Sequence, residues 1–152
     1  MRITAMIPVY REPKRVGDML AKLLACDYPD RDVIVVVDGP TNPAIESALD
    51  PHRSAIAVHY NGERLGKTES LNRVAFAQKT DAFLMLDNDI ELPDDPLYLR
   101  KLSVRMETAD LVEIPKEAIC KKPISRMMSI EFLSNAMLSM TMAKLAKRTP
   151  SM

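Results

Sequence analysis

Residues 82–90 read Ala-Phe-Leu-Met-Leu-Asp-Asn-Asp-Ile, an apolar run that passes directly into two carboxylates separated by one residue. The run is too short and too continuous for an amphipathic helix, so it predicts a strand covered on both faces, as in a parallel sheet. In extended backbone Asp87 and Asp89 point to the same side, where both could face one divalent cation, or a cation and a ribose hydroxyl. Taken alone, the same spacing also fits a polar loop whose aspartates cap turns.

Strand-like and helical patterns alternate along the rest of the chain. Strands are expected at residues 3–9, 33–37, 55–60, 82–86 and 110–115, and helices at 14–26, 43–49, 67–78 and 97–106. This alternation predicts an α/β fold, a three-layer sandwich with a mainly parallel sheet between helices. The apolar stripe expected on helix 67–78 consists of Leu71, Val74, Ala75 and Phe76.

Composition excludes several classes of protein. Twenty-one lysines and arginines balance 21 aspartates and glutamates, so we expect no basic field that would attract nucleic acid. With 152 residues, of which 47% are hydrophobic, the chain can bury one sizeable core. Cys26 and Cys120 lie far apart without a C-x-x-C motif, which predicts reduced thiols and a cytoplasmic protein. No segment is expected to act as a signal peptide or to span a membrane.

Polar side chains follow several of the predicted strands. Because the carboxyl ends of parallel strands meet at one edge of a sheet, we expect these side chains to converge there. They are Tyr10 and Glu12 after the first strand, Asp38 after the second, and Asp87 and Asp89 after the fourth. Gly66 allows a close backbone turn, and Lys67 at a helix start could reach a phosphate. The chain has neither a G-x-x-x-x-G-K-[ST] loop nor a G-x-G-x-x-G motif, which argues against an ATPase or a dinucleotide-binding protein.

Four segments, taken in order, are similar to a known family. They read I-P-V-Y-R-E at 7–12, V-V-V-D-G at 35–39, L-G-K-T-E-S-L-N at 65–72 and L-M-L-D-N-D-I-E-L-P at 84–93. Over residues 2–115 the chain resembles the family 2 inverting glycosyltransferases. The resemblance implies a Rossmann-like sheet of the GT-A type and a nucleotide-diphospho-sugar as the bound donor.

The resemblance also implies which residues hold the nucleotide. Tyr10 would stack on the base, and Asp38 would hydrogen-bond it. The turn at Gly66 and Lys67 would lie beside the base and the diphosphate. The same motifs add four residues to the expected donor site: Pro8, Glu12, Asn72 and Asn88.

The metal is expected at the two aspartates. By the same resemblance Asp87 would contact the ribose or the sugar, and Asp89 would bind the cation that bridges the diphosphate. Mg²⁺ and Mn²⁺ suit this role because both prefer oxygen ligands. The chain is therefore expected to be a metal-dependent glycosyltransferase that moves a sugar from its donor to an acceptor hydroxyl.

One part of the family pattern is missing. An inverting glycosyltransferase needs a general base for the acceptor hydroxyl, and the family places it in an acidic motif after a Gly-rich segment. This sequence has no such motif, and it lacks the Q-x-x-R-W motif and any tryptophan. The remaining acidic candidates are Asp94, Asp95, Glu107, Asp110 and Glu113. We therefore expect only the donor-binding portion of the enzyme, and the alternative is a non-catalytic nucleotide-sugar-binding or regulatory remnant. Nucleotidyltransferases are disfavoured because residues 8–13 lack a Gly-rich, Arg-containing loop.

The C-terminal part differs in pattern. We expect residues 1–115 to form the nucleotide-sugar-binding half and residues 116–152 to form a connector and the start of an incomplete acceptor half, so that the fold is truncated within or just after its first acceptor-side helix. Residues 125–147 predict one long, methionine-rich helix. Its apolar residues cover most of its circumference, which fits core packing, a helix that lies peripherally on a membrane surface, or the seam of a homo-oligomer.

Overall fold

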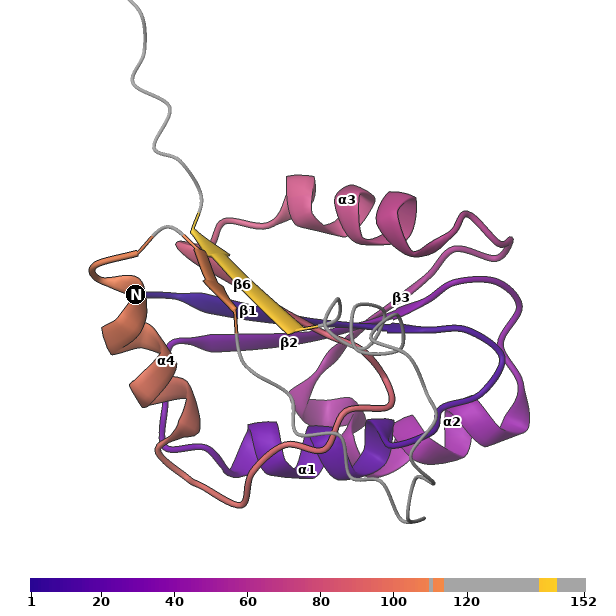
Figure 1. The fold of residues 1–152 in the computed structure, drawn as a ribbon. Coiled ribbons are helices and arrows are strands. Elements are labelled where there is room, and N and C mark those ends of the chain that lie inside the picture. The colour runs from indigo at the N-terminus through magenta and orange to yellow at the C-terminus, as the bar shows by residue number, and fades with distance from the viewer. Residues whose placement is uncertain (110, 114–139, 145–152) are drawn as a thin grey trace, which may run out of the picture.

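The computed structural model describes residues 1–109, 111–113 and 140–144, which form a six-stranded sheet with helices on both faces (Figure 1). The strand order is β3-β2-β1-β4-β6-β5. The first four strands of this order are parallel, and β6 is antiparallel to both β4 and β5. The strands are β1 (Ile3–Val9), β2 (Arg31–Val37), β3 (Ala57–Tyr60), β4 (Ala82–Leu86), β5 (Leu111–Glu113) and β6 (Met140–Lys144). The predicted α/β fold with a mainly parallel sheet is confirmed.

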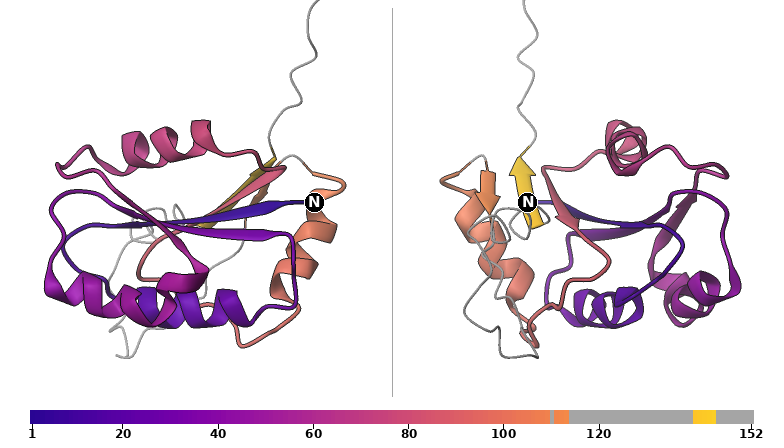
Figure 2. Two further views of the ribbon diagram at one scale, coloured as in Figure 1. Left: turned by 180° about the vertical axis from the view of Figure 1, so that it is seen from behind. Right: turned by 45° about the vertical axis from the view of Figure 1, so that its right-hand side comes forward.

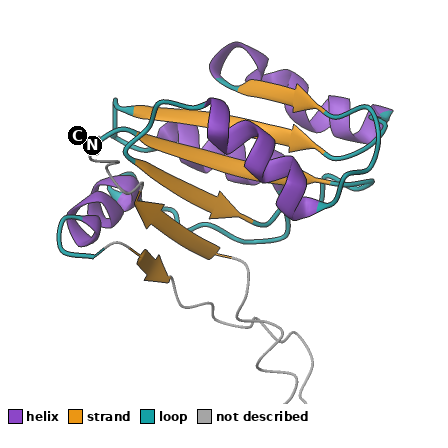
Figure 3. Cartoon of the chain, turned by 90° about the horizontal axis from the view of Figure 1, so that it is seen from above, coloured by secondary structure: helices purple, strands orange, loops and turns teal. Residues whose placement is uncertain are grey.

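The helices form the two outer layers. They are α1 (Val16–Ala25), α2 (Pro43–Leu49), the short 3-10 helix η1 (Asp50–Ala55), α3 (Lys67–Ala77) and α4 (Tyr98–Met106). Helices α1 and α2 cover one face of the sheet, and α3 covers the other (Figure 2). Seen from above, α3 lies across the parallel strands, and α4 lies beside the edge formed by β5 and β6 (Figure 3).

The buried positions of the central strands are apolar, except Thr4 in β1, because both faces of these strands are covered. In β2, Val33, Val35 and Val37 belong to the core under α1 and α2. Ile34 and Val36 belong to the second, smaller core under α3. Successive side chains of a strand point to opposite faces, so a strand between two helical layers needs no polar position. This explains why the sequence shows continuous apolar runs rather than alternation.

The expected stripe on α3 is wrong at one position. Leu71 and Val74 are buried, and Ala75 is partly buried against the same core. Phe76 instead is 90% exposed. Val74 and Ala75 lie three and four residues after Leu71 and therefore share its face of the helix. Phe76 lies five residues after Leu71, so it points to solvent.

The expected helix over residues 125–147 is wrong at residues 140–144. There the chain forms β6, which pairs with β4 from Leu86↔Met140 to Ala82↔Lys144. Met, Ala and Lys are good helix formers, but the free edge of β4 offers unpaired backbone groups to any segment that reaches it. The rest of the predicted helix lies outside the described residues. The proposed boundary near residue 115 stays a prediction.

Two further expectations concern thiols and membranes. Cys26 is a buried free thiol at the end of α1, and burial raises its pKa; Cys120 lies outside the described residues. Within the described ranges, the helices are too short or too polar to cross a lipid bilayer.

Candidate functional site

A cavity of about 330 Å³ opens where β1, β2 and β4 end and α3 begins. Eight of the ten residues predicted for the donor site line it: Pro8, Tyr10, Asp38, Gly66, Lys67, Asp87, Asn88 and Asp89. Glu12 and Asn72 do not, and both are exposed. The strand ends therefore converge at one edge, as expected.

Three lining residues were not predicted, namely Val9, Lys14 and Arg64. Lys14 lies in the turn R-E-P-K-R that follows β1, and Arg64 lies two residues before Gly66. Both are cations next to positions already selected, and this proximity was the signal available in the sequence. Nothing local distinguishes them from solvated surface charges, and only the fold turns them toward the cavity.

Asp38 holds the loop that leads to α3. Its side chain is 5% exposed, and its carboxylate accepts hydrogen bonds from the backbone N–H of Leu65 (2.7 Å) and of Gly66 (3.0 Å) and from the Asn61 amide (3.2 Å). Burial alone would raise the pKa of Asp38, but the hydrogen bonds from Leu65, Ser70, Asn61 and Gly66 outweigh it and lower the pKa. The residue is therefore a buried anion that anchors the 61–66 loop.

Gly66 makes the turn into α3 possible. Its backbone has φ 88° and ψ 154°, a region that essentially only glycine occupies. Its carbonyl accepts from the backbone N–H and the hydroxyl of Ser70, at 3.0 and 2.8 Å. Lys67, the first residue of α3, thus starts a helix whose N-terminal N–H groups lie at the cavity, a position that favours anions.

Two guanidinium groups lie near the Tyr10 ring. The guanidinium carbon of Arg64 is 4.5 Å from the ring centroid, and that of Arg11 is 4.9 Å away. These are cation–π distances. A Cβ at Gly39 would lie 3.5 Å from the ring, an ordinary van der Waals contact, so the positive φ of 119° rather than lack of space favours glycine there.

The two aspartates of the D-N-D segment both face the cavity, and each meets a lysine. Asp89 Oδ2 is 3.0 Å from Lys14 Nζ, and Asp87 pairs with Lys67. The Asp87 side chain is 21% exposed and that of Asp89 is 55% exposed. Ile90, directly after them, is buried in the core under α1, which holds the segment at the sheet edge.

Asn88, between the two aspartates, fastens the turn after β1. Its side-chain amide donates to the Glu12 carbonyl at 2.8 Å, and its own carbonyl accepts from the Arg15 N–H at 2.9 Å. In this turn Arg11 and Lys14 have positive φ, 62° and 43°. The contacts of Asn88 and Glu12 are therefore structural, and they position Lys14 above Asp89.

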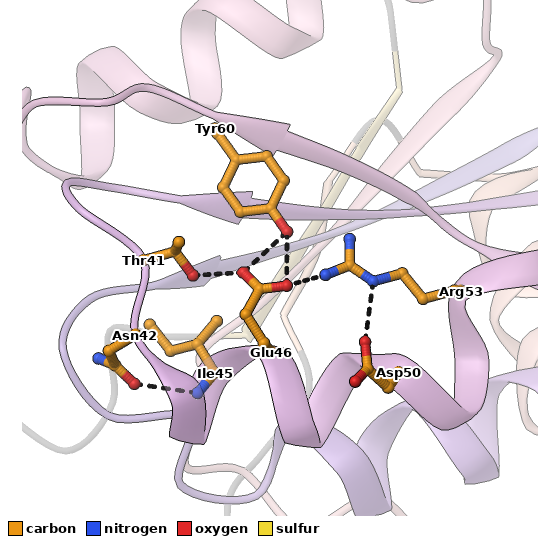
Figure 4. Close-up of polar contacts among 7 residues, drawn as sticks. All are labelled: Thr41, Asn42, Ile45, Glu46, Asp50, Arg53 and Tyr60. Carbon is orange, nitrogen blue, oxygen red and sulfur yellow. Dashed lines mark hydrogen bonds and ion pairs between the residues drawn. The ribbon is translucent and has the colours of Figure 1, made fainter.

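A second polar cluster, outside the cavity, connects β3 to the segment after β2 (Figure 4). Glu46 accepts from the hydroxyls of Thr41 and Tyr60 and pairs with Arg53. The hydrogen bond from Thr41 is the largest cause that lowers the pKa of Glu46, followed by those of Tyr60 and Arg53. Asn42 caps α2 by accepting from the Ile45 N–H at 3.1 Å. These contacts hold the backbone that follows Asp38.

The chemistry of the site fits a hard divalent cation. Asp87 and Asp89 supply carboxylate oxygens on one turn, the ligands that Mg²⁺ and Mn²⁺ prefer. Among the described residues no group of three or more His, Cys, Asp or Glu side chains gathers as a complete metal site. A cation here would therefore take its remaining oxygens from phosphate and water, as Mg²⁺ commonly does.

An open, mainly parallel sheet with a mixed acidic and basic cavity at its carboxyl edge defines an α/β protein of the class that binds its ligands at that edge. Residues 4–141 match the family model of glycosyl transferase family 2. The chain therefore belongs to this family, and the predicted resemblance is confirmed.

Relatives agree with this assignment. The poly-beta-1,6-N-acetyl-D-glucosamine synthase of Staphylococcus epidermidis strain RP62A is 26% identical over 99 residues, which cover 64% of this chain. This chain spans about a quarter of that relative, 24%.

Two solved structures share the GT-A fold. The mannosyltransferase PcManGT from Pyrobaculum calidifontis, in complex with GDP-Man and Mn²⁺, matches with a TM-score of 0.64 at 22% identity. The match covers 76% of this chain and 36% of the mannosyltransferase chain. TarS 1-349 of S. aureus, in complex with UDP-GlcNAc, has a TM-score of 0.64 at 17% identity and covers 83% of this chain and 37% of its own. At these identities the likeness shows the fold alone.

Proposed function

We propose that this chain binds a nucleotide-diphospho-sugar together with Mg²⁺ or Mn²⁺, and that it is the donor-binding portion of an inverting glycosyltransferase. The observation that carries the proposal is that eight residues selected from four separate motifs line one cavity at the carboxyl edge of the sheet. Independent surface residues would not be expected to converge in this way. Related structures that contain GDP-Man and Mn²⁺, or UDP-GlcNAc, support the same class of ligand.

In this proposal each part of the cavity has a task. Tyr10 offers a ring face for the base, and Asp38 keeps the 61–66 loop in place beside it. Lys67 and the N-terminus of α3 attract the diphosphate. Asp89 would hold the cation, and Asp87 would contact the ribose or the sugar. The cation would stabilise the charge that develops on the departing diphosphate.

The test is binding with and without metal. Calorimetric titration with UDP and GDP should show binding with Mn²⁺ and none with EDTA, because the phosphates and the two aspartates repel each other without a cation. Asp89→Asn should weaken binding by at least about 10-fold. Loss of a residue that merely orients a metal ligand already costs about 10- to 100-fold in metal affinity, and loss of a direct ligand should cost no less. Glu91→Gln is the matched control, since Glu91 is an exposed carboxylate paired with Arg15 at 3.1 Å and is absent from the cavity lining. Equal affinity with EDTA and with Mn²⁺ would contradict the proposal.

A non-catalytic nucleotide-sugar-binding protein is the second candidate. It is favoured because each carboxylate in the described cavity lining already has a partner and is not free to act as the general base. Asp38 accepts from backbone N–H groups, and Asp87 and Asp89 each pair with a lysine. Two of the other acidic candidates, Asp94 and Asp95, lie outside the cavity lining. Asp94 pairs with Lys22, and Asp95 pairs with Lys101. Glu107 ends α4, away from the lining. Asp110 lies outside the described residues, as does the side chain of Glu113.

Cellular location and association belong to the same proposal. We expect a cytoplasmic protein that is peripheral at a membrane or self-associated. Sedimentation with and without anionic vesicles would test this expectation. Strictly monomeric protein that ignores the vesicles would contradict it.

A further inference from the structure

Lysines of the chain itself hold the two carboxylates that face the cavity. Lys14 Nζ lies 3.0 Å from Asp89 Oδ2, and Lys67 pairs with Asp87. The two lysines come from different elements, one from the turn before α1 and one from the start of α3. All four residues line the same cavity.

The position of Lys14 is built into the fold. Its backbone lies in the left-handed region, at φ 43°, which is unfavourable for a residue with a side chain. The turn keeps this conformation because the Asn88 amide binds the Glu12 carbonyl and the Asn88 carbonyl accepts from the Arg15 N–H. Asn88 stands between the two aspartates, so one residue fixes the carboxylates and the lysine that faces them.

The charges of the residues that line the cavity cancel, because three cationic side chains face three carboxylates. A divalent cation would add two positive charges, and the two phosphate groups of a nucleotide-diphospho-sugar would add one negative charge each. Cation and donor together therefore preserve the balance, whereas either one alone breaks it. The charged lining residues are the cations Lys14, Arg64 and Lys67 and the anions Asp38, Asp87 and Asp89.

We propose that Lys14 takes the place of the divalent cation at Asp89 and moves to the diphosphate when cation and donor bind, so that it is a donor-positioning residue. This inference rests on the proposed function. An ammonium group and a metal ion at the same carboxylate oxygen repel each other, so Lys14 leaves Asp89 when the metal arrives. Its side chain is 46% exposed and carries its charge on a flexible four-carbon stem. A phosphate in the same cavity then offers it another anionic partner.

The proposal predicts opposite changes in two affinities. Lys14→Met removes the competitor for Asp89, so Mn²⁺ alone should bind about two- to five-fold more tightly, which corresponds to the loss of one partly exposed ion pair. With saturating Mn²⁺, UDP or GDP should bind about five- to tenfold more weakly, because one charge-assisted contact to the diphosphate is gone. Lys14→Arg should restore part of the nucleotide affinity, since it keeps the charge.

The experiment measures Mn²⁺ binding by electron paramagnetic resonance and nucleotide binding by calorimetry, on the full chain. Arg15→Met is the matched control. It removes the neighbouring cation, whose partner is Glu91 and which is absent from the lining, so both affinities should stay as in the parent. Lys14→Gln is a second variant, and thermal melting confirms that each protein is folded.

The outcomes separate this inference from the proposed function. Opposite changes in Lys14→Met and Lys14→Gln support the exchange. The exchange is overturned if both affinities fall together, or if both equal those of Arg15→Met. In that case the proposed function still stands, provided that the parent binds nucleotide with Mn²⁺ and Asp89→Asn does not. A parent protein that binds neither UDP nor GDP with Mn²⁺ overturns the proposed function and this inference with it.

Discussion

Replacing Asp38 by asparagine should destabilise the protein more than its small change in shape suggests. One carboxylate oxygen accepts from Leu65 and Asn61, and the other accepts from Gly66 at 3.0 Å. An asparagine keeps one acceptor and turns an NH₂ group toward the Gly66 N–H. One charge-assisted hydrogen bond is lost, worth about 1.5 to 3 kcal/mol, and the others become neutral and weaker.

We therefore expect the free energy of unfolding to fall by about 2 to 4 kcal/mol and Tm by about 4 to 16 °C, at about 2 to 4 °C per kcal/mol for a chain of this size. The control is Asp32→Asn, which removes an exposed ion pair with Arg2 at 2.7 Å. This pair should contribute less than about 1 kcal/mol. Chemical and thermal denaturation of both variants at pH 7 measures the difference.

The dependence on pH gives a second, independent check. The pKa of Asp38 is lowered in the folded protein, so its stabilising contribution is complete above the pKa of the unfolded chain, about 3.9. The contribution is lost as the pH falls through the lower pKa of the folded state. The gap between parent and Asp38→Asn should thus be full at pH 7 and narrow below about pH 4. A variant that melts with the parent at pH 7, or a gap that widens in acid, would refute the role assigned to Asp38.

Three further changes test the site. Tyr10→Ala should weaken binding of UDP or GDP in Mn²⁺ about 5- to 150-fold, since stacking of one base contributes about 1 to 3 kcal/mol. Phe76→Ala is the control, because Phe76 is 90% exposed and lies outside the cavity lining; it should bind as the parent does, and equal affinities for the two variants would place the base elsewhere. Gly66→Ala should lower the free energy of unfolding by about 1 to 3 kcal/mol because of the backbone conformation of Gly66. Gly17→Ala in α1 should leave the free energy of unfolding unchanged or raise it, because the added Cβ would lie 3.6 Å from the Ala48 carbonyl oxygen, an ordinary contact. Denaturant melts measure both, and equal stabilities would contradict the role given to the Gly66 turn. The chain should bind donor yet form no product from labelled sugar nucleotides with saccharide or lipid acceptors, because general-base assistance contributes about 10² to 10⁴ in rate and each carboxylate of the described cavity lining is already engaged. Robust transfer that Asp89→Asn abolishes would show that a base exists.

Much of the fold could be predicted from local sequence. The apolar runs of β1, β2 and β4 are short and continuous, and only a strand with both faces covered explains such a run. The sheet edge followed from the same runs, because parallel strands bring their carboxyl ends together. Asp38 and the two aspartates after β4 were therefore expected near one another before any coordinate was known. Their roles toward a ligand stay predictions.

Other features depend on contacts between distant parts of the chain. Lys14 meets Asp89 across 75 positions of sequence, and no periodicity links a turn after the first strand to one after the fourth. Asp38 was expected to face a base, yet its carboxylate receives the N–H groups of a loop 27 residues away.

Residues 140–144 show the same limit most plainly. Their residue types favour a helix, and the strand β6 forms because β4 presents unpaired N–H and C=O groups at the edge of the sheet. Sequence patterns report the burial and the local preference of a segment, which depend on neighbours a few residues away. The partner of a charge or of a strand edge depends on which segments the completed sheet brings within hydrogen-bonding distance, and only the tertiary structure decides that.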